Sequence, residues 1–182
     1  KDEESEGLSE TGVSYIDFIK NEVNRMHSLV KSLGDYIRIG KSKDVQEFDM
    51  VTQVKLALVQ LKPVIENLYP KITIGNLPMA YGVDTEIQVV WYQLLSNAFK
   101  FRNSQANLHI TISSEEKEHE QIFHLQDNGM GIAAEHHEKI FEIFRRLHLR
   151  EQYPGSGMGL AICKTISNNS DEYETYCSVL LS

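Results

Sequence analysis

Residues that could bind a phosphorylated nucleotide form three clusters in the second half of the chain. The first, here called the helix cluster, is Leu94–Phe101. Asn97 and Lys100 are three positions apart, a spacing that places two side chains on one face of a helix. An amide oxygen can ligate Mg²⁺, and an ammonium group one turn further on can meet a phosphate. The same two residue types also occur together on ordinary exposed helices, so the helix cluster is informative only beside the other two.

The other two clusters are rich in glycine. In the first glycine cluster, Asp127–Ile132, a carboxylate follows a strand-like segment and can accept a hydrogen bond from an exocyclic amine such as that of adenine. Its glycines permit tight turns and close approach of a ligand. The second glycine cluster, Gly155–Leu160, opens a helical segment, where backbone N–H groups at the positive end can meet a phosphate. An Asn-Gly turn and a flexible hinge are the ordinary alternatives.

Other nucleotide and metal motifs fail on their spacing. Gly40-Lys41-Ser42 resembles the end of a P-loop, but Asp35 stands where that loop needs a glycine. The third glycine of the second glycine cluster comes one residue too early for a dinucleotide fingerprint. His136-His137-Glu138 lacks the second histidine of a zinc helix. No spacing supports a catalytic Ser/His/Asp or Cys/His set, so no catalytic residue is assigned within the chain.

The periodicity after Lys41 predicts the mixed α/β framework that would hold these clusters. A charged linker over Lys41–Glu47 leads into the helices and strands. Helices are expected over Val51–Asn67, with Asp49 or Thr52 near its start and Pro63 kinking or ending it, from a cap at Asp84 to about Phe101, and over Leu160–Ile166. Strands are expected around Ile72–Ile74, Leu108–Ile112, Phe123–Leu125 and Tyr176–Leu181, with a hairpin turn over Ser113–Glu120.

The N-terminal part carries the most regular apolar pattern in the chain. After an acidic leader, Lys1–Glu10, apolar residues alternate spacings of three and four, and we call them the seam: Ile16, Ile19, Val23, Met26, Val30, Leu33 and Ile37. This spacing is typical of a helix packed lengthwise in a coiled coil or bundle. The chain offers no second helix of matching pattern, which favours an intermolecular bundle. A long helix lying on its own domain is the alternative.

Composition bounds the class of protein. The chain has 182 residues, enough for one domain with a sizeable core and an appended element. With 18 basic and 26 acidic residues its net charge is −8, which argues against a general nucleic-acid binder but allows a locally basic site. No apolar run approaches the roughly 20 residues of a membrane span. The two cysteines, Cys163 and Cys177, suggest a reducing compartment.

Taken together and in this order, the clusters resemble the ATP-binding domain of sensor histidine kinases. Asn97-Ala98-Phe99-Lys100-Phe101 is similar to the asparagine box of that family, and the two glycine clusters are similar to its glycine boxes. Ile140–His148 resembles the phenylalanine box and ATP lid. Arg146-Leu147-His148 followed by Tyr153-x-Gly155 is most similar to the phytochrome-like branch.

The resemblance implies an α/β two-layer sandwich of the histidine kinase, gyrase and chaperone type, with an N-terminal bundle-forming helix. It also implies a set of ligand contacts. Asn97 would ligate Mg²⁺, with Gln93 as a second candidate, Lys100 would touch phosphate, and Asp127 would read adenine. The remaining expected ATP-binding residues are Phe101, Gly129, Gly131, Ile132, Arg146, Gly155, Ser156, Gly157, Met158, Gly159 and Leu160.

The resemblance also assigns roles outside the three clusters. Arg146 and Arg150 could approach the γ-phosphate, and Phe141 and Phe144 would anchor the lid. Residues 1–42 resemble an acidic leader and the second helix of a dimerisation and phosphoacceptor hairpin whose first helix is expected before Lys1. Residues 43–182 resemble the ATP-binding catalytic domain.

Three features depart from the family pattern. Gln93 stands where many relatives carry a further asparagine. The phosphoacceptor histidine box is absent, because His27 is followed by Ser28 and Leu29 and not by an acid and a proline; we interpret His27 as a residue on the bundle surface. After Ile166 the C-terminal end is shorter than in relatives, through a lost strand or an omitted stretch.

The sequence therefore predicts the ATP-binding catalytic part of a cytoplasmic sensor histidine kinase. It would transfer the γ-phosphate of ATP, with Mg²⁺, to a histidine on a helix outside this chain, for relay to the aspartate of a response regulator receiver domain. A homodimer through the helical bundle is expected, without nucleic acid or membrane contact by this segment. A degenerate, non-enzymatic dimeric signalling module is the alternative. An ATPase of the wider superfamily is disfavoured, since Gln93 and Ser96 offer no carboxylate to activate water.

Overall fold

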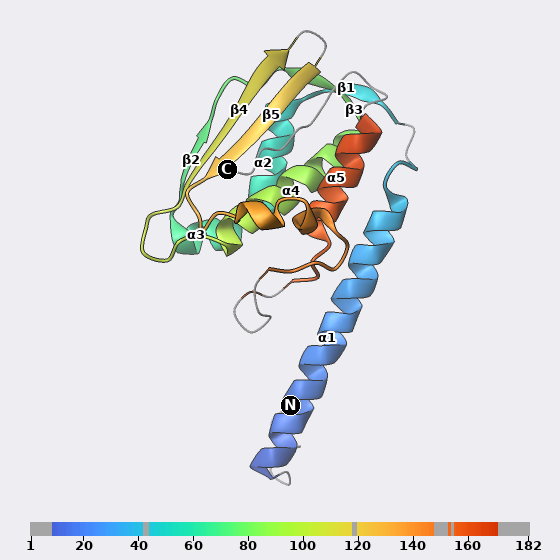
Figure 1. The fold of residues 1–182 in the computed structure, drawn as a ribbon, viewed down its shortest axis with the longest axis vertical. Helices are drawn as coiled ribbons and strands as arrows, with labels where there is room; N and C mark the ends of the chain where they lie inside the picture. The colour runs from blue at the N-terminus through green and yellow to red at the C-terminus, as the bar shows by residue number, and fades with distance from the viewer. Residues whose placement is uncertain (1–8, 42–43, 118–119, 148–152, 154, 171–182) are drawn as a thin grey trace. The chain divides into compact units, whose positions relative to one another are not determined.

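The polypeptide divides into two units, Lys1–Ile37 and Arg38–Ser182, which are described separately. The computed structural model describes residues 9–41, 44–117, 120–147, 153 and 155–170 (Figure 1). Among these residues, no helix combines the length and apolar character needed to cross a membrane. The predicted final strand Tyr176–Leu181, Arg150 and the shortened C-terminal end lie outside the described residues.

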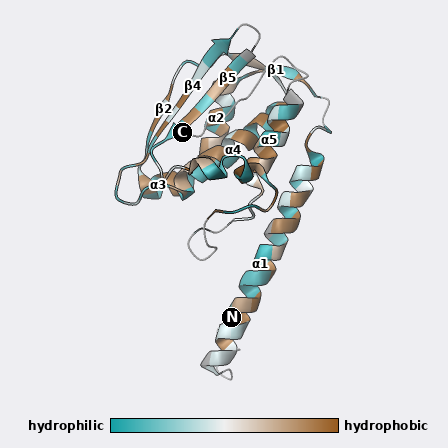
Figure 2. Cartoon of the chain, viewed as in Figure 1, coloured by the Kyte–Doolittle hydropathy of each residue, from teal (hydrophilic) through white to brown (hydrophobic). Residues whose placement is uncertain are grey.

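The first unit is formed by helix α1, Glu10–Arg38. The helix that the seam predicts is present, and apolar and polar residues alternate along it (Figure 2). The seam side chains keep between 41% of their surface exposed, at Leu33, and 70%, at Val30. An apolar stripe of this length gains no stability from burial while it stays exposed to water.

The second unit contains a three-stranded sheet in the order β2-β4-β5. Strand β2, Lys71–Ile74, is parallel to β4, His109–Lys117, and β4 is antiparallel to β5, Glu120–Asp127. Alternate side chains of β4 and β5, among them Ile110, Ile112, Phe123 and Leu125, are buried. In this register Asp127 pairs with Ile110, so its carboxylate lies at the end of β5.

Helices form the second layer of the sandwich (Figure 1). Helix α4, Asp84–Lys100, packs against both α2, Met50–Gln60, and α5, Gly159–Ser170. The buried face of α4 includes Trp91, whose indole Nε1 donates to the Met50 sulfur at 3.1 Å. The predicted two-layer α/β sandwich is confirmed, with α4 at the centre of the helical layer.

A second, two-stranded sheet was not predicted. Strand β1, Gln46–Asp49, pairs antiparallel with β3, Met79–Gly82, and the facing residues Phe48 and Ala80 are both buried. Part of β1 lies in the segment expected to be a charged linker. Its polar sequence carries little strand signal because pairing with β3, distant in sequence, specifies the strand.

The predicted helix over Val51–Asn67 is two helices. It breaks at Leu61 between α2 and α3, Lys62–Leu68, and Pro63 lies in the first turn of α3, where a missing N–H costs nothing. Asp49 caps α2, because its side chain accepts hydrogen bonds from the backbone N–H groups of Val51 and Thr52. The predicted cap at Asp84 is wrong: Val83 is the cap residue, and Asp84 is the first residue of α4.

The hairpin turn expected over Ser113–Glu120 is also wrong as to its length. Ser113–Lys117 continue β4 and pair with β5, with Ser114 opposite Phe123 and Glu116 opposite Gln121. Lys117 and Glu116 are exposed, so polar residues on this end of the hairpin follow from solvent contact and not from a turn. Helix α5 likewise continues to Ser170, beyond the predicted end at Ile166.

Loss of the Asp49 cap should destabilise the second unit. Asp49→Ala should lower the melting temperature at pH 7, whereas Asp49→Asn should retain most of the stability, because asparagine is an equally good N-cap. The hydrogen bond from the Thr52 hydroxyl is the main cause that lowers the pKa of Asp49 below 3.8. The ionised cap therefore stabilises the fold fully above pH 3.8, the ordinary pKa of the carboxyl. The difference in stability between wild type and Asp49→Ala should shrink as the pH falls below that value, because the carboxyl becomes protonated. A pH-independent difference, measured by thermal unfolding, would contradict this origin.

Candidate functional site

The helix cluster lies on the last two turns of α4. Burial of the opposite face of α4, with Leu94, Leu95 and Ala98 in the core, leaves Gln93, Asn97 and Lys100 half-buried at spacings of four and three. The side chain of Gln93 faces the start of α5: a Cβ atom on Gly159 would lie 2.6 Å from Gln93 Oε1. The amide group of Gln93 therefore lies beside the first turn of α5.

The first glycine cluster is joined to the end of α4 by close backbone contacts. The Gly129 N–H donates to Asp127 Oδ1 at 2.7 Å, and the Met130 N–H donates to the Phe101 carbonyl at 3.0 Å. A Cβ atom on Gly129 would lie 2.6 Å from both Asp127 Oδ1 and the Phe101 carbonyl oxygen. Glycine at 129 is thus required by close approach, and the contact places Asp127 beside Phe101.

Asn128, between Asp127 and Gly129, has a structural role. Its Oδ1 accepts from the His109 N–H at 2.8 Å, and its Nδ2 donates to the Asn107 carbonyl at 2.9 Å. These bonds fix the turn after β5 against the start of β4.

Burial raises the pKa of Asp127, and the hydrogen bond from the Gly129 N–H opposes that rise.

The second glycine cluster packs against the lid segment, which we define as Ile140–Leu147. Gly157 has a φ of +74°, and a Cβ atom there would lie 2.8 Å from the Arg145 carbonyl oxygen. Glycine at 157 therefore meets both a left-handed backbone and a close contact. The first turn of α5 follows, and the Met158 N–H donates a 3.3 Å hydrogen bond to Ser156 Oγ.

The remaining predicted ATP-binding residues differ in how they could reach a ligand. Met158 is fully buried and offers a ligand no exposed surface, whereas Ser156, Leu160 and Ile132 are half-buried. Gly131 is exposed, has a φ of +67°, and would have no atom within 4 Å of an added Cβ. Among the described residues, no group of three or more His, Cys, Asp or Glu side chains could hold a metal ion by itself.

Ile140 and Phe141 hold the N-terminal end of the lid segment against α5. Two short 3₁₀ helices, η1 (Ala134–His136) and η2 (Lys139–Phe141), lead into it, and η2 packs against α5. Ile140 is buried, and the Lys164 ammonium lies 5.4 Å from the centre of the Phe141 ring. Phe144, expected to anchor the lid, is 51% exposed and has a φ of +63°.

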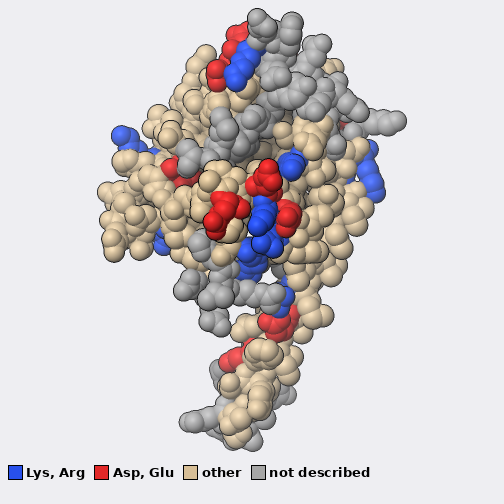
Figure 3. Space-filling model, viewed as in Figure 1, with Lys and Arg blue, Asp and Glu red and all other residues tan. Residues whose placement is uncertain are grey.

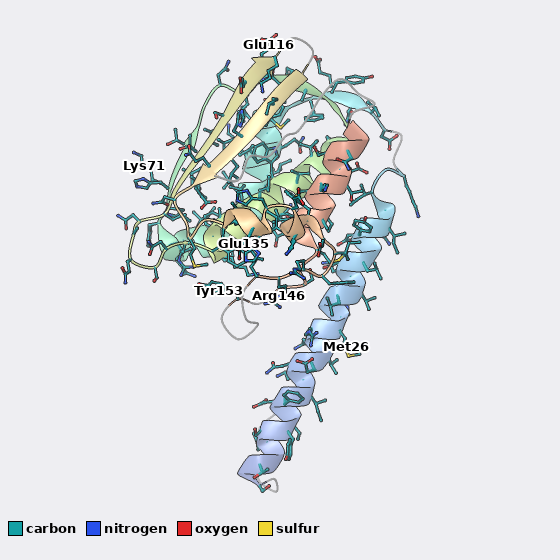
Figure 4. The ribbon with its side chains drawn as sticks, in the orientation of Figure 1. Met26, Lys71, Glu116, Glu135, Arg146 and Tyr153 are labelled. Carbon is teal, nitrogen blue, oxygen red and sulfur yellow. The ribbon has the colours of Figure 1, made fainter. Side chains whose placement is uncertain are left out.

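Arg146 and Tyr153 connect the lid segment to the rest of the site (Figure 4). The Arg146 guanidinium donates to the Tyr153 carbonyl and, at 2.9 Å, to the Gly155 carbonyl. The Tyr153 ring lies 5.2 Å from the Phe101 ring, centroid to centroid, at a tilt of 39°. The Tyr153 hydroxyl donates to the Met130 sulfur at 3.4 Å.

Positive charge gathers where the helix cluster meets the second glycine cluster. The Lys100 ammonium lies 4.6 Å from the centre of the Phe101 ring. A Cβ atom added to Gly155 would lie 2.8 Å from the Lys100 ammonium nitrogen. Burial, and then the charge of Arg146, lowers the pKa of Lys100. Acidic and basic side chains lie side by side on the face shown in Figure 3. Among the described ion pairs, the Arg145 guanidinium lies 4.0 Å from the Glu142 carboxylate, just after η2. A polyanion such as a triphosphate would relieve the repulsion between Lys100 and Arg146.

The structure brings all three clusters together around Phe101, and it adds two residues that the sequence did not single out. Tyr153 and Met130 contact each other and lie at Phe101. Met130 lies between two glycines of the first glycine cluster, and this position carries no signal of its own. Tyr153 belongs to the pattern that resembles the phytochrome-like branch, and an aromatic residue just before a glycine cluster is a signal for a ligand-facing ring.

The chain is similar to one family of ATPases and to several known proteins. Residues 82–178 match the model for the histidine kinase-, DNA gyrase B- and HSP90-like ATPase family. The phytochrome-like protein Cph1 of Synechocystis sp. is 36% identical over 163 residues, which is 89% of this chain and 22% of that protein. Hybrid signal transduction histidine kinase B of Dictyostelium discoideum is 28% identical over 171 residues, 87% of this chain and 9% of that protein.

Solved structures show the same fold. Full-length ShkA in complex with AMPPNP gives a TM-score of 0.67 at 20% identity, covering 90% of this chain and 35% of that one. The histidine kinase ThkA in complex with the response regulator protein TrrA gives 0.61 at 25% identity, covering 88% and 46%. The chain spans about a fifth of the length of the phytochrome-like relatives it matches.

Asp127 should cost stability while it serves the site. Because burial raises its pKa, the folded state is destabilised at neutral pH, and that cost disappears once the carboxyl is protonated in both states, below pH 3.8. Asp127→Asn should therefore unfold at the same or a higher temperature than wild type at pH 7, with the difference vanishing toward pH 3.8. A clearly lower melting temperature at pH 7 would show that Asp127 is needed mainly for folding.

Proposed function

This chain belongs to the family of histidine kinase-, DNA gyrase B- and HSP90-like ATPases. We propose that, as the ATP-binding catalytic part of a phytochrome-like sensor histidine kinase, it transfers the γ-phosphate of ATP to a histidine side chain. The acceptor would be carried on a dimerisation helix other than α1. The phosphoryl group would then pass to an aspartate of a response regulator, in keeping with the ThkA–TrrA complex among the structural relatives.

The observation that carries this proposal is the contact between the end of α4 and the turn after β5. Through Met130 and Gly129, this contact places a half-buried carboxylate, that of Asp127, next to the backbone carbonyl of Phe101. Lys100, from the same end of α4, lies next to Gly155. An adenine amine at Asp127 and phosphates between Lys100 and the first turn of α5 would match both ends of one ATP molecule.

The residues present also suit Mg²⁺. The Asn97 and Gln93 side chains offer amide oxygens one helical turn apart on α4, and Mg²⁺ takes its remaining ligands from phosphates and water. A glutamine in place of an asparagine keeps the oxygen and adds one methylene. When bound, Mg²⁺ would neutralise charge that develops on the transferring phosphate.

Catalysis by this chain would consist of positioning and charge compensation. Asp127 would fix the base, and Lys100 and Arg146 would balance the charge of the phosphates. The acceptor histidine nitrogen attacks the γ-phosphorus as the bond to the bridging oxygen breaks and ADP leaves. Gln93 and Ser96 have no carboxylate to activate water, which favours transfer to histidine over hydrolysis.

Helix α1 would bring two copies of the chain together. Its exposed seam, from Ile16 to Ile37, has the spacing of a bundle helix. In a bundle formed by the dimerisation hairpins of two copies, the neighbouring helices would cover this seam. A homodimer of this kind would hold each ATP-binding domain near an acceptor helix. ATP and a response regulator are available together in the cytoplasm, where we place the reaction.

Phosphotransfer should depend on the Asp127 carboxylate. With radiolabelled ATP, Mg²⁺ and a supplied helical hairpin that bears the acceptor histidine, the wild-type chain should form an acid-labile phosphohistidine. Asp127→Asn should weaken Mg-ATP binding by about tenfold or more, as loss of a charged hydrogen bond implies. Asp44→Asn, a change at an exposed carboxylate of the same unit, should behave as wild type.

The outcomes separate the candidate functions. Absence of Mg-ATP binding by the wild-type chain in calorimetry would refute the kinase. Binding of Mg-ATP without transfer to the supplied hairpin would support the non-enzymatic signalling module.

Dimerisation should depend on the seam. Val23→Asp and Leu33→Asp each place a charge among apolar side chains and should shift the monomer–dimer equilibrium toward monomer by at least tenfold. Asn21→Asp adds the same charge off the seam and serves as the matched control. Sedimentation velocity measures the equilibrium, and equal dimer fractions in all four proteins would refute a bundle through α1.

A further inference from the structure

Tyr153 is an aromatic residue that contacts two of the three clusters at once. Its ring packs on Phe101, the last residue of the helix cluster, at 5.2 Å between centroids. Its hydroxyl donates to the sulfur of Met130, in the first glycine cluster, at 3.4 Å. The side chain is half-buried by these contacts. Tyr153 lies outside the three clusters, and the sequence did not predict a role for it in ligand binding.

The surface that Tyr153 touches is tied to α4 by backbone hydrogen bonds and lies close to Asp127. The Phe101 N–H donates to the Asn97 carbonyl at 2.8 Å, and the Met130 N–H donates back to the Phe101 carbonyl at 3.0 Å. Gly129 lies close to both Asp127 Oδ1 and the same Phe101 carbonyl. An aromatic and thioether surface beside a single carboxylate is suited to a purine base, whose flat faces are apolar and whose edge carries an amine.

Arg146 holds the backbone at Tyr153 in place. Its guanidinium donates to the Tyr153 carbonyl and to the Gly155 carbonyl, so one planar fork fixes two points of the chain. Gly155 in turn lies next to the Lys100 ammonium. The position of the Tyr153 ring therefore depends on a cation that sits on the phosphate side of the site.

Building on the proposed function, we propose that Tyr153 is a base-contacting residue that packs with Phe101 on the adenine of ATP. We further assign Arg146 as the positioning residue that keeps Tyr153 there through the two carbonyl bonds. The lid thus contributes to recognition of the base as well as of the phosphates. Arg146, which the sequence predicts near the γ-phosphate, affects base affinity through Tyr153.

The test compares three probes: Mg-ATP, adenosine and tripolyphosphate, each measured by calorimetry or by competition with a fluorescent ATP analogue. Tyr153→Ala should weaken both Mg-ATP and adenosine by at least about fivefold, because stacking of a base on an aromatic ring is lost. Tripolyphosphate should bind the variant within about twofold of wild type. Tyr153→Phe keeps the ring and should restore most of the lost affinity.

Arg146→Ala separates positioning from direct phosphate contact. If Arg146 holds Tyr153, the variant should lose adenosine affinity by a factor similar to that of Tyr153→Ala, and the double variant should lose little more adenosine affinity than either alone. Loss confined to Mg-ATP and tripolyphosphate would overturn the positioning role. Tyr81→Ala, at a tyrosine of β3 that is 52% exposed, is the matched control and should bind all three probes as wild type does.

Failure of this inference is distinguishable from failure of the proposed function. If the wild-type chain binds no Mg-ATP, the proposed function fails. If wild type binds and Tyr153→Ala binds Mg-ATP and adenosine equally well, the role of Tyr153 is refuted and the kinase stands. An equal loss of tripolyphosphate binding would likewise refute contact with the base. Fluorescence of Trp91, the one tryptophan of the chain and fully buried, reports whether each variant is folded.

Discussion

The contact between the end of α4 and the turn after β5 is the interaction on which the candidate site depends. Gly129 and Met130 meet the Phe101 carbonyl closely enough that any side chain at 129 would collide with it. Both elements are fixed independently, α4 by burial of Trp91 and its neighbours in the core and β5 by pairing with β4. Their junction therefore transmits the rigidity of the core to Asp127, and glycine is the only residue that allows the junction to close.

The charges of the site follow from this packing. Asp127 lies in a partly desolvated position that raises its pKa, and Lys100 lies in one that lowers its pKa. Neither is favourable for the folded chain alone, since each group is charged near neutral pH. Unfavourably placed charges of opposite sign at the two ends of one site are typical of functional positions, because a ligand with an amine at one end and phosphates at the other compensates both. An acidic chain can thus hold a polyanion.

Much of the fold could be predicted from the sequence, and the failures have physical causes. Helices α1, α2, α4 and α5 and strands β2, β4 and β5 follow from periodicity, and Asp49 caps α2 as one of two expected residues. Strand β1 was missed because it is specified by pairing with β3, and the hairpin turn was placed too broadly because exposed strand ends and turns are equally polar. The candidate site residues were predicted from the order of their clusters along the chain. The contacts of Tyr153 and Arg146 join residues through carbonyl groups and a ring face, which leave no spacing signal.

The central claim is that three clusters separated in sequence form one ATP site around Phe101. Titration of Mg-AMPPNP into the ¹⁵N-labelled chain, followed by amide resonances, tests that claim most directly. One site predicts that the amides of Gly129 and Met130, after β5, and of Gly157 and Gly159, before and in α5, shift along a single saturation curve, while those of α3 do not. Shifts confined to one cluster, or two clusters that saturate at different ligand concentrations, would contradict a single site.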